Sequence, residues 1–193
     1  MKASIILKDV SKAYNGQPVL SNLSFTLTPG SVTAITSPSG SGKTTLLRIL
    51  MGLTAPDSGS IENLSQYKKS AVFQEDRLCD NLTALANIQL TAQQASRADI
   101  LKAMELFGLS GCEKRLTYEL SGGMKRRIAI LRALFADYDL LLLDEPFKGL
   151  DSETKEIVIA ETRRHSLGKT VVFTTHDRHE LEGMEIKQEI RTL

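Results

Sequence analysis

Cysteine is scarce in this chain, and neither sign of charge is in large excess. The 193 residues include only Cys79 and Cys112, and the formal net charge is +1. The two cysteines show neither metal-ligand spacing nor a disulfide framework, which is typical of a reducing compartment. A net charge this small argues against broad electrostatic binding of nucleic acid or of anionic lipid.

Long apolar runs are also lacking. The longest uncharged aliphatic run covers residues 140–143, far fewer than the roughly 20 residues that cross a bilayer. The N-terminal residues form no apolar stretch of signal-peptide type. We therefore expect a cytoplasmic chain whose membrane contacts go through a separate protein. With 41% hydrophobic and 24% charged residues, the chain has the composition of a globular protein, and we expect a single domain over residues 1–193.

The most informative stretch combines small residues with a lysine between two apolar segments. Residues 32–36 predict a strand before it, and residues 46–50 have helical spacing after it. Glycines let a backbone approach a ligand closely, and the N–H groups of such a loop and helix start face a polyanion. Lys43 adds charge where β- and γ-phosphates would lie, and Thr44 offers a hydroxyl to Mg²⁺. A flexible linker is the alternative. The residues of this loop are Ser37, Pro38, Ser39, Gly40, Ser41, Gly42, Lys43, Thr44 and Thr45.

Two acidic residues follow a continuous aliphatic strand. Residues 140–143 are typical of a strand buried in a parallel sheet. Asp144 and Glu145 come directly after it, at the edge where such sheets bind ligands. Asp144 is a candidate Mg²⁺ ligand, and Glu145 is a candidate base for a water that attacks a γ-phosphate.

Two more polar residues stand at predicted strand ends. Gln74 follows a short strand at 70–73 and could reach Mg²⁺ or the attacking water. His176 follows a buried-type strand at 171–175 and could donate a hydrogen bond to a γ-phosphate oxygen. A purely structural role is the alternative for each residue.

A second glycine-rich helix start lies far along the chain. Ser121 is a predicted N-cap, and Gly122 and Gly123 expose backbone N–H groups that suit an anion. Since one phosphate loop already wraps its own ligand, this site could close over the nucleotide of another copy of the chain. An ordinary glycine-rich cap is the alternative. The basic residues 125–127 that follow are interpreted as a solvated helix face, with a partner-contacting patch as the alternative.

The remaining patterns predict a small antiparallel sheet and a mainly helical region. Tyr14, in a polar turn, could stack on a base, with a structural role as the alternative. Ser152 is a candidate N-cap of the helix at 152–164. Strands are predicted at 3–7, 24–28, 61–64, 70–73, 140–143, 171–175 and 186–193. Helices are predicted within 77–135, including 95–107, and at 152–164 and 177–182.

The motifs follow one another along the chain in the order SPSGSGKTT, Gln74, LSGGM, LLLLDEP, the stretch 149–151 and His176. Taken in this order, they resemble the nucleotide-binding domain of ABC-type ATPases over nearly the whole chain. LSGGM placed shortly before LLLLDEP is the most specific signal among them. The resemblance implies an α/β P-loop NTPase fold of ABC type, with a mainly parallel sheet core, a small antiparallel β subdomain and a helical subdomain at about 77–135.

The resemblance implies how nucleotide and partner copy are bound. Tyr14 would stack on the adenine of ATP, and residues 37–45 would wrap its phosphates. Ser121, Gly122 and Gly123 would cap the γ-phosphate held by the opposite protomer of a head-to-tail dimer. Asp151 would lie at the dimer interface.

The resemblance also implies which residues carry out the chemical step. Glu145 would be the general base, and His176 would contact the γ-phosphate. Thr44 and Asp144 would hold Mg²⁺, Asp144 through water. Gln74 would sense both Mg²⁺ and the transmembrane partner.

On this resemblance we expect an ATP-hydrolysing subunit that powers an ABC transporter, a bacterial small-solute importer. Its partners would be ATP, Mg²⁺, a second copy of itself, a separate transmembrane permease and a solute-binding protein, but no nucleic acid. It would lie on the cytoplasmic face of the membrane. Residues 72–78 and 82–88, together with LSGGMKRR and DEPFKGLD, are similar to importers of nitrate, sulfonates and taurine.

Three alternatives stay open at this point. One is an ABC ATPase that regulates a membrane complex without moving a solute. Another is a nucleotide-binding module with little hydrolysis, because Ser37 replaces the usual first glycine of the loop. If that position requires a positive φ, serine would cost roughly 1 kcal/mol or more. The third is an ABC protein acting on DNA or ribosomes, which usually has paired domains or long coiled coils.

Overall fold

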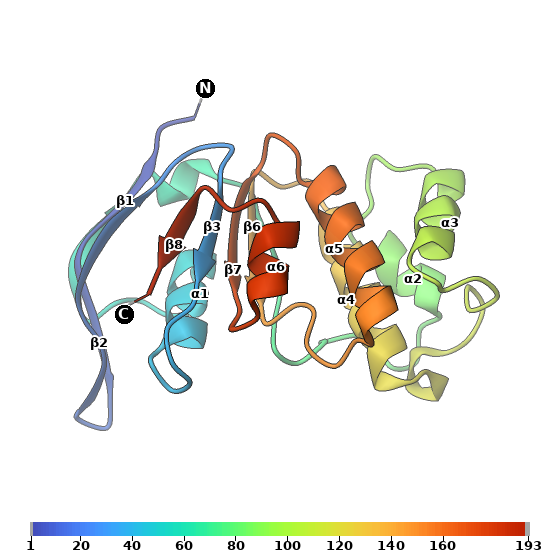
Figure 1. Cartoon of the computed structure of the whole chain (residues 1–193), viewed down its shortest axis with the longest axis horizontal. Coiled ribbons are helices and arrows are strands. Elements are labelled where there is room, and N and C mark those ends of the chain that lie inside the picture. The colour runs from blue at the N-terminus through green and yellow to red at the C-terminus, as the bar shows by residue number, and fades with distance from the viewer. Residues whose placement is uncertain (1, 192–193) are drawn as a thin grey trace.

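A five-stranded parallel sheet forms the centre of the molecule (Figure 1). The computed structural model describes residues 2–191. The strands lie in the order β5-β6-β7-β3-β8, and each neighbouring pair is parallel. They are β3 (Val32–Ile35), β5 (Lys69–Val72), β6 (Leu140–Asp144), β7 (Thr170–Thr174) and β8 (Gln188–Ile190). Since parallel strands share one direction, the loops after β3, β6 and β7 emerge at the same edge of the sheet.

The two central strands match the prediction of a buried parallel position. Every residue of β6 and β7 is buried, which explains their continuous apolar character. The predicted last strand at 186–193 is shorter, because only β8 pairs with β3. Residues 192–193 of that prediction lie outside the described residues.

A second, antiparallel sheet has the order β2-β1-β4. Its strands are β1 (Ile5–Tyr14), β2 (Gln17–Leu27) and β4 (Ser58–Glu62). Both β1 and β2 are longer than predicted, because they pair up to a tight turn at Asn15 and Gly16. These two residues have φ values of 50° and 78°, the left-handed conformation that a two-residue hairpin turn requires. β4 lies earlier than the predicted strand at 61–64.

Helix α1 (Lys43–Met51) packs between the two sheets (Figure 1). It begins after Gly42, whose φ is 96°, and ends before Gly52, whose φ is 82°. Its apolar side chains share one core cluster with β1, β2 and β6; they are Leu46, Leu47, Ile49 and Leu50. The helix start is therefore held rigidly against the sheet edge.

The other helices cover the far side of the parallel sheet and extend away from it (Figure 1). Between β5 and β6 come α2 (Ala84–Gln89), α3 (Arg97–Leu106) and α4 (Gly122–Leu134). Later come α5 (Ser152–His165) and α6 (Arg178–Gly183). Short 3₁₀ turns lie at Leu64–Gln66 and Thr117–Glu119. The predicted α/β architecture, with its parallel core, small antiparallel sheet and helices, is confirmed.

Helix starts follow the capping rules with one correction. Ser121 caps α4 as predicted, its side chain accepting from the Met124 N–H. The N-cap of α5 is Asp151 and not Ser152, because the Asp151 carboxylate accepts from the Thr154 N–H while Ser152 is already helical. Asp151 keeps the extended backbone that an N-cap needs.

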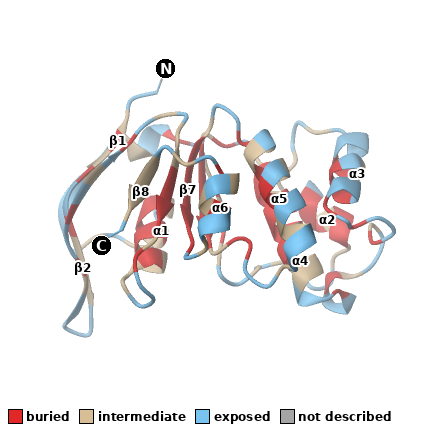
Figure 2. Cartoon of the chain, in the orientation of Figure 1, coloured by how far each residue is buried: buried red, intermediate tan, exposed pale blue. Residues whose placement is uncertain are grey.

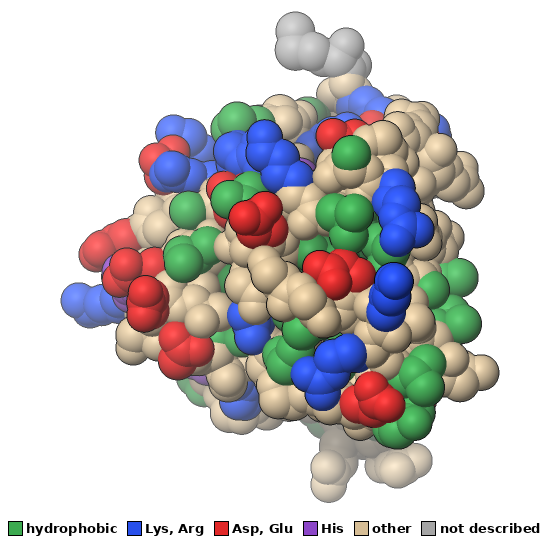
Figure 3. All heavy atoms as spheres, turned by 90° about the vertical axis from the view of Figure 1, so that its right-hand side faces the viewer, with side chains coloured by type: hydrophobic (Ala, Val, Ile, Leu, Met, Phe, Trp, Pro, Cys, Tyr) green, Lys and Arg blue, Asp and Glu red, His purple; other side chains and the backbone are tan. Residues whose placement is uncertain are grey.

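Two apolar cores hold the molecule together. One joins α2, α3, α4 and α5 to one face of the parallel sheet, and the other surrounds α1. Figure 2 shows the buried faces of α4 and α5 turned inward. On the end of the molecule that carries α3, basic and acidic side chains alternate with apolar ones (Figure 3). Among the described residues, none of the helices has the length and apolar character to span a membrane.

Candidate functional site

A pocket of about 270 Å³ lies at the carboxyl edge of the parallel sheet, over the start of α1. It joins the loop after β3 to the residues that follow β5 and β6. Gly42 must be glycine here, because a Cβ would lie 2.8 Å from the Val19 carbonyl oxygen. The pocket is lined by Val19, Ser39, Gly40, Gly42, Lys43, Thr44, Thr45, Gln74, Asp144 and Glu145. The fold thus brings three separate predicted motifs to one cavity.

Lys43 lies buried inside the loop. Its ammonium donates to the carbonyls of Ser37 at 2.6 Å and Pro38 at 2.9 Å. Its Nζ is also 2.9 Å from Nε2 of His176. An ammonium only donates, so this contact requires His176 to accept through Nε2. Burial lowers the pKa of Lys43, while the charges of Glu145 and Asp144 oppose that shift. A phosphate ligand could take over these donors.

Asp144 is held by two threonine hydroxyls. Thr44 donates to Oδ2 at 2.7 Å, and Thr174 donates to Oδ1 at 2.9 Å. The same Thr174 oxygen accepts from the Glu145 N–H at 2.8 Å. Thr174 therefore fixes both acids, although sequence reasoning missed it. A threonine at the end of a buried strand, after three apolar residues, was the available signal.

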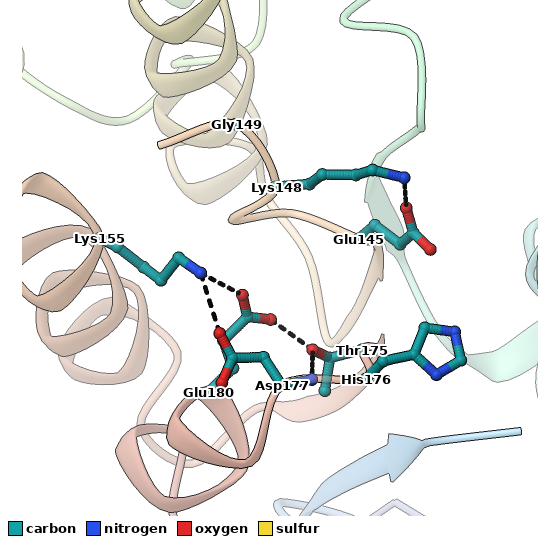
Figure 4. A pocket seen from close by; sticks show the side chains of 8 residues that line it. All are labelled: Glu145, Lys148, Gly149, Lys155, Thr175, His176, Asp177 and Glu180. Carbon is teal, nitrogen blue, oxygen red and sulfur yellow. Dashed lines mark hydrogen bonds and ion pairs between the residues drawn. The ribbon is translucent and has the colours of Figure 1, made fainter. Parts of the chain in front are cut away.

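Glu145 has a left-handed backbone and a charged neighbour. Its φ is 45°, a conformation that costs a non-glycine residue about 1–3 kcal/mol and clusters at functional sites. Its Oε2 accepts from the Lys148 ammonium at 2.6 Å, as Figure 4 shows. This contact holds the pKa of Glu145 below its usual range, although burial opposes the shift. Sequence reasoning did not single out Lys148.

A second cavity of about 380 Å³ adjoins the first on the side of Glu145 and His176. On its far wall the Lys155 ammonium contacts Asp177 at 3.0 Å and Glu180 at 3.2 Å (Figure 4). Hydrogen bonds from Lys155 lower the pKa of Asp177, and Asp177 in turn raises the pKa of Lys155. The loop that carries His176 is therefore tied to α5.

Two of the basic residues 125–127, Arg126 and Arg127, do not belong to the solvated face that the sequence predicted. Arg126 is only 6% exposed and bonds to backbone carbonyls near Gln74 and Glu145. Arg127 donates to the carbonyls of Phe107 and Gly108. Both guanidiniums point inward, since tertiary packing places loop carbonyls against this side of α4.

The second glycine-rich start lies apart from the phosphate-loop pocket. Ser121 and Gly122 are exposed, and they are not among the described residues that line that pocket. A Cβ on Gly123 would lie 3.9 Å from the Gly149 carbonyl, so this start packs beside the loop that leads to Asp151. The pKa of Asp151 is lowered by its cap hydrogen bonds from Thr154.

The proposed adenine-stacking residue also lies outside the pocket lining. Tyr14, at the end of β1, is 42% exposed, with the Lys12 ammonium 5.5 Å from its ring centroid. Val19, across the hairpin, lines the pocket instead and was missed from the sequence.

Ser37 does not have the backbone conformation that would have made it costly. It is not among the described non-glycine residues with positive φ, so no left-handed strain arises. Its side chain is fully buried, and its Oγ has no hydrogen-bond partner among the described residues. Serine therefore fits the backbone of this position but leaves a polar atom unsatisfied.

The donor set suits a nucleotide and a hard cation. Thr44 Oγ1 and an Asp144 carboxylate oxygen lie 2.7 Å apart, and Gln74 lines the same pocket. Hydroxyl, carboxylate and amide oxygens are the ligands that Mg²⁺ prefers. The buried Ser41 Oγ, also without a described partner, is a further polar atom of the loop.

Comparisons with known proteins agree with this geometry. A family model described as ABC transporter matches residues 20–148. The chain is 37% identical to the Fe(3+) ions import ATP-binding protein FbpC of Brucella abortus, over 92% of this chain and 55% of that protein. It is 33% identical to the sulfate/thiosulfate import ATP-binding protein CysA of Mycobacterium tuberculosis, over 100% of this chain and 59% of that protein. The chain thus spans little more than half the length of these relatives.

Solved structures share the fold over almost the full chain. The dimeric structure of MJ0796, a bacterial ABC transporter cassette, has a TM-score of 0.82 and 31% identity, covering 96% of both chains. A second structure of that cassette, in a post-hydrolysis state bound to ADP and Pi, gives a TM-score of 0.82 and 30% identity over the same shares.

Proposed function

The chain belongs to the ABC transporter family, and from that premise we propose that it is the ATP-binding and ATP-hydrolysing subunit of a bacterial small-solute importer. One observation carries the proposal. The phosphate loop and the two acids at the end of β6 meet in one pocket, where Thr44 and Thr174 hold both oxygens of Asp144. Relatives named as import ATP-binding proteins support the importer part.

Each residue of the pocket has a part in the proposed reaction. Lys43 and the loop N–H groups bind the phosphates, and Thr44 and Asp144 hold Mg²⁺ together with Gln74. The bound cation supplies positive charge to the phosphate oxygens. Glu145, whose pKa the Lys148 contact holds below its usual range, is a carboxylate that accepts the proton of the attacking water.

We further propose that two copies form the complete site. Ser121, Gly122 and Gly123 lie away from the phosphate loop of their own chain, and the first two are exposed. They can therefore cap the γ-phosphate bound by a second copy, with Asp151 at the interface and His176 on the phosphate. The relative MJ0796 is described as dimeric in its solved structure.

The remaining partners are also proposals. We propose a transmembrane permease, bound near Gln74, and a solute-binding protein of the same system. The subunit would lie peripherally on the inner face of the membrane. Residues 1–193 would be one ABC ATPase domain with a helical subdomain at about 77–135, and Tyr14 would stack on adenine.

The identity of the solute is left open in this proposal, within the class of small solutes. The stretches 72–78 and 82–88 resemble importers of nitrate, sulfonates and taurine. The relatives at 33–37% identity are named for iron and for sulfate or thiosulfate. We therefore keep the nitrate, sulfonate and taurine type as a finer hypothesis within small-solute import.

The test uses purified Glu145→Gln protein with and without MgATP. Light scattering after size exclusion should show an ATP-dependent dimer, because ATP binds but is not hydrolysed. Phosphate release should fall to background. The matched control is Glu156→Gln, an exposed acid on α5, which should keep wild-type turnover.

Two outcomes would contradict the proposal. Wild-type turnover in Glu145→Gln would remove Glu145 from its role. ATP binding by wild type in a direct titration, without any phosphate release, would favour the nucleotide-binding module with little hydrolysis. The conformation of Ser37 gives that alternative no structural basis.

A further inference from the structure

The guanidinium of Arg126 joins two loops that are far apart in the sequence. On one side it donates to the backbone carbonyls of Pro146 at 2.9 Å, Asp144 at 3.0 Å and Glu145 at 2.7 Å. Arg126 projects from α4 and is 6% exposed. Three consecutive carbonyls, from the last residue of β6 into the loop after it, therefore converge on one side chain.

The other side of the same guanidinium contacts the loop after β5. Nη1 donates to the Phe73 carbonyl at 2.6 Å and to an Asp76 carboxylate oxygen at 3.0 Å, with the Gln74 carbonyl at 3.4 Å. Arginine has five N–H donors in a rigid planar fork. This fork is the right shape to bridge two loops, and Asp76 supplies the opposite charge that a buried cation needs.

Both bridged loops carry a residue of the phosphate-loop pocket. Gln74 and Glu145 line that pocket from opposite loops. Glu145 has φ 45°, and a strained backbone of this kind persists only where its surroundings hold it. Its backbone contacts include the Thr174 hydroxyl on its N–H, and both Arg126 at 2.7 Å and the Lys148 N–H at 3.3 Å on its carbonyl.

We propose that Arg126 is a positioning residue for ATP hydrolysis. It holds the left-handed turn that aims Glu145 into the pocket and fixes the distance between Glu145 and Gln74. It touches neither nucleotide nor cation itself. The inference rests on the proposed function, since it concerns how the proposed base is placed.

The test compares Arg126→Met with Arg126→Lys and with a control on the same helix. Met keeps the length and loses every donor. Lys keeps the charge beside Asp76 but has a single nitrogen, which cannot serve both loops. The control is Arg132→Met, because Arg132 donates only to the carbonyls of Asp76 and Arg77 among the described residues.

The readouts are kcat, the Kd for ATP, the melting temperature and amide hydrogen exchange. We expect Arg126→Met to lose about a hundredfold in kcat, the size expected when a reacting group shifts by about 1 Å. The Kd for ATP should stay near wild type, because Lys43 and its loop are untouched. Amide exchange should speed up at both 73–76 and 144–145. Arg132→Met should keep kcat and alter exchange only near 76–77.

Several results would overturn the inference. One is wild-type kcat in Arg126→Met, and another is a loss of kcat that simply follows the fall in melting temperature. If Arg126→Met does not fold, Arg126→Lys decides by the same kcat and Kd comparison. If neither variant folds, Arg126 serves the fold as a whole and is not a positioning residue.

Failure of the proposed function is seen separately. A wild-type protein that binds ATP but does not hydrolyse it would refute the function. In that case amide exchange at 73–76 and 144–145 still tests the bridge that Arg126 makes between the two loops. Unchanged amide exchange at either loop in Arg126→Met would refute the bridge made by Arg126.

Discussion

Replacing Ser37 by alanine should stabilise the protein. The Ser37 side chain is fully buried, and its Oγ has no hydrogen-bond partner among the described residues. A buried hydroxyl without a partner costs about 1–3 kcal/mol, which the unfolded chain avoids by bonding water. Alanine removes the hydroxyl and keeps the Cβ that the backbone already accommodates. We expect a gain of about 1 kcal/mol in the free energy of unfolding, after the loss of packing by one oxygen.

Glycine at the same position should gain less than alanine. Ser37 is not among the described residues with positive φ, so glycine offers no relief of strain. It adds backbone freedom to the unfolded chain, at about 0.4–1 kcal/mol relative to alanine. Ser37→Gly should therefore lie close to wild type, although the usual phosphate loop has glycine there.

The assay is urea unfolding followed by circular dichroism, without nucleotide, supported by thermal melts. For a chain of 193 residues, a gain of about 1 kcal/mol raises the melting temperature by about 2–4 °C. Ser39→Ala is the control, because Ser39 is exposed and should change stability by less than about 0.5 kcal/mol. Destabilisation of Ser37→Ala would refute the reasoning, since it would show that the hydroxyl has a hydrogen-bond partner in solution.

Three further predictions concern the acids of the site. Lys148→Met removes the ammonium that lowers the pKa of Glu145, so that pKa rises and the acid limb of the kcat–pH profile moves to higher pH; an unmoved limb would contradict the contact. Thr174→Val leaves Asp144 Oδ1 and the Glu145 N–H without their partner. It should lower the free energy of unfolding, measured in urea, by about 1–3 kcal/mol, and an unchanged urea midpoint would argue against a stabilising role of these hydrogen bonds. Asp151→Ala removes the N-cap of α5 and should cost about 1 kcal/mol, whereas Asp151→Asn should restore most of that loss.

Local patterns predicted the elements that carry the site. A strand, a glycine loop and a helix could be recognised around Lys43 because each is set by neighbouring residues. The acids at the end of β6 could be placed at the sheet edge because a continuous aliphatic run indicates a buried parallel strand. The lengths of β1 and β2 could not be predicted from local patterns, since these lengths depend on pairing across the hairpin.

Long-range partners were beyond the reach of the sequence. Arg126 has the same sequence signature as an exposed basic residue of a helix, and only carbonyls 18 to 53 residues away make it internal. Thr174 was predicted only as part of a buried strand, and its hydrogen bond to Asp144 joins residues that are 30 positions apart. Lys148 lies three residues from Glu145, but only the left-handed turn at Glu145 brings the two side chains together.

The sequence by itself determined the family, the order of the strands and helices, and the residues at the ends of β3, β5, β6 and β7. These follow from local spacing and from motifs that are continuous along the chain. The tertiary structure alone decided which polar groups are buried and what each one contacts. The reason is physical: a hydrogen bond or a desolvated charge depends on every group within a few ångströms, and most of those around Glu145 come from elsewhere in the chain.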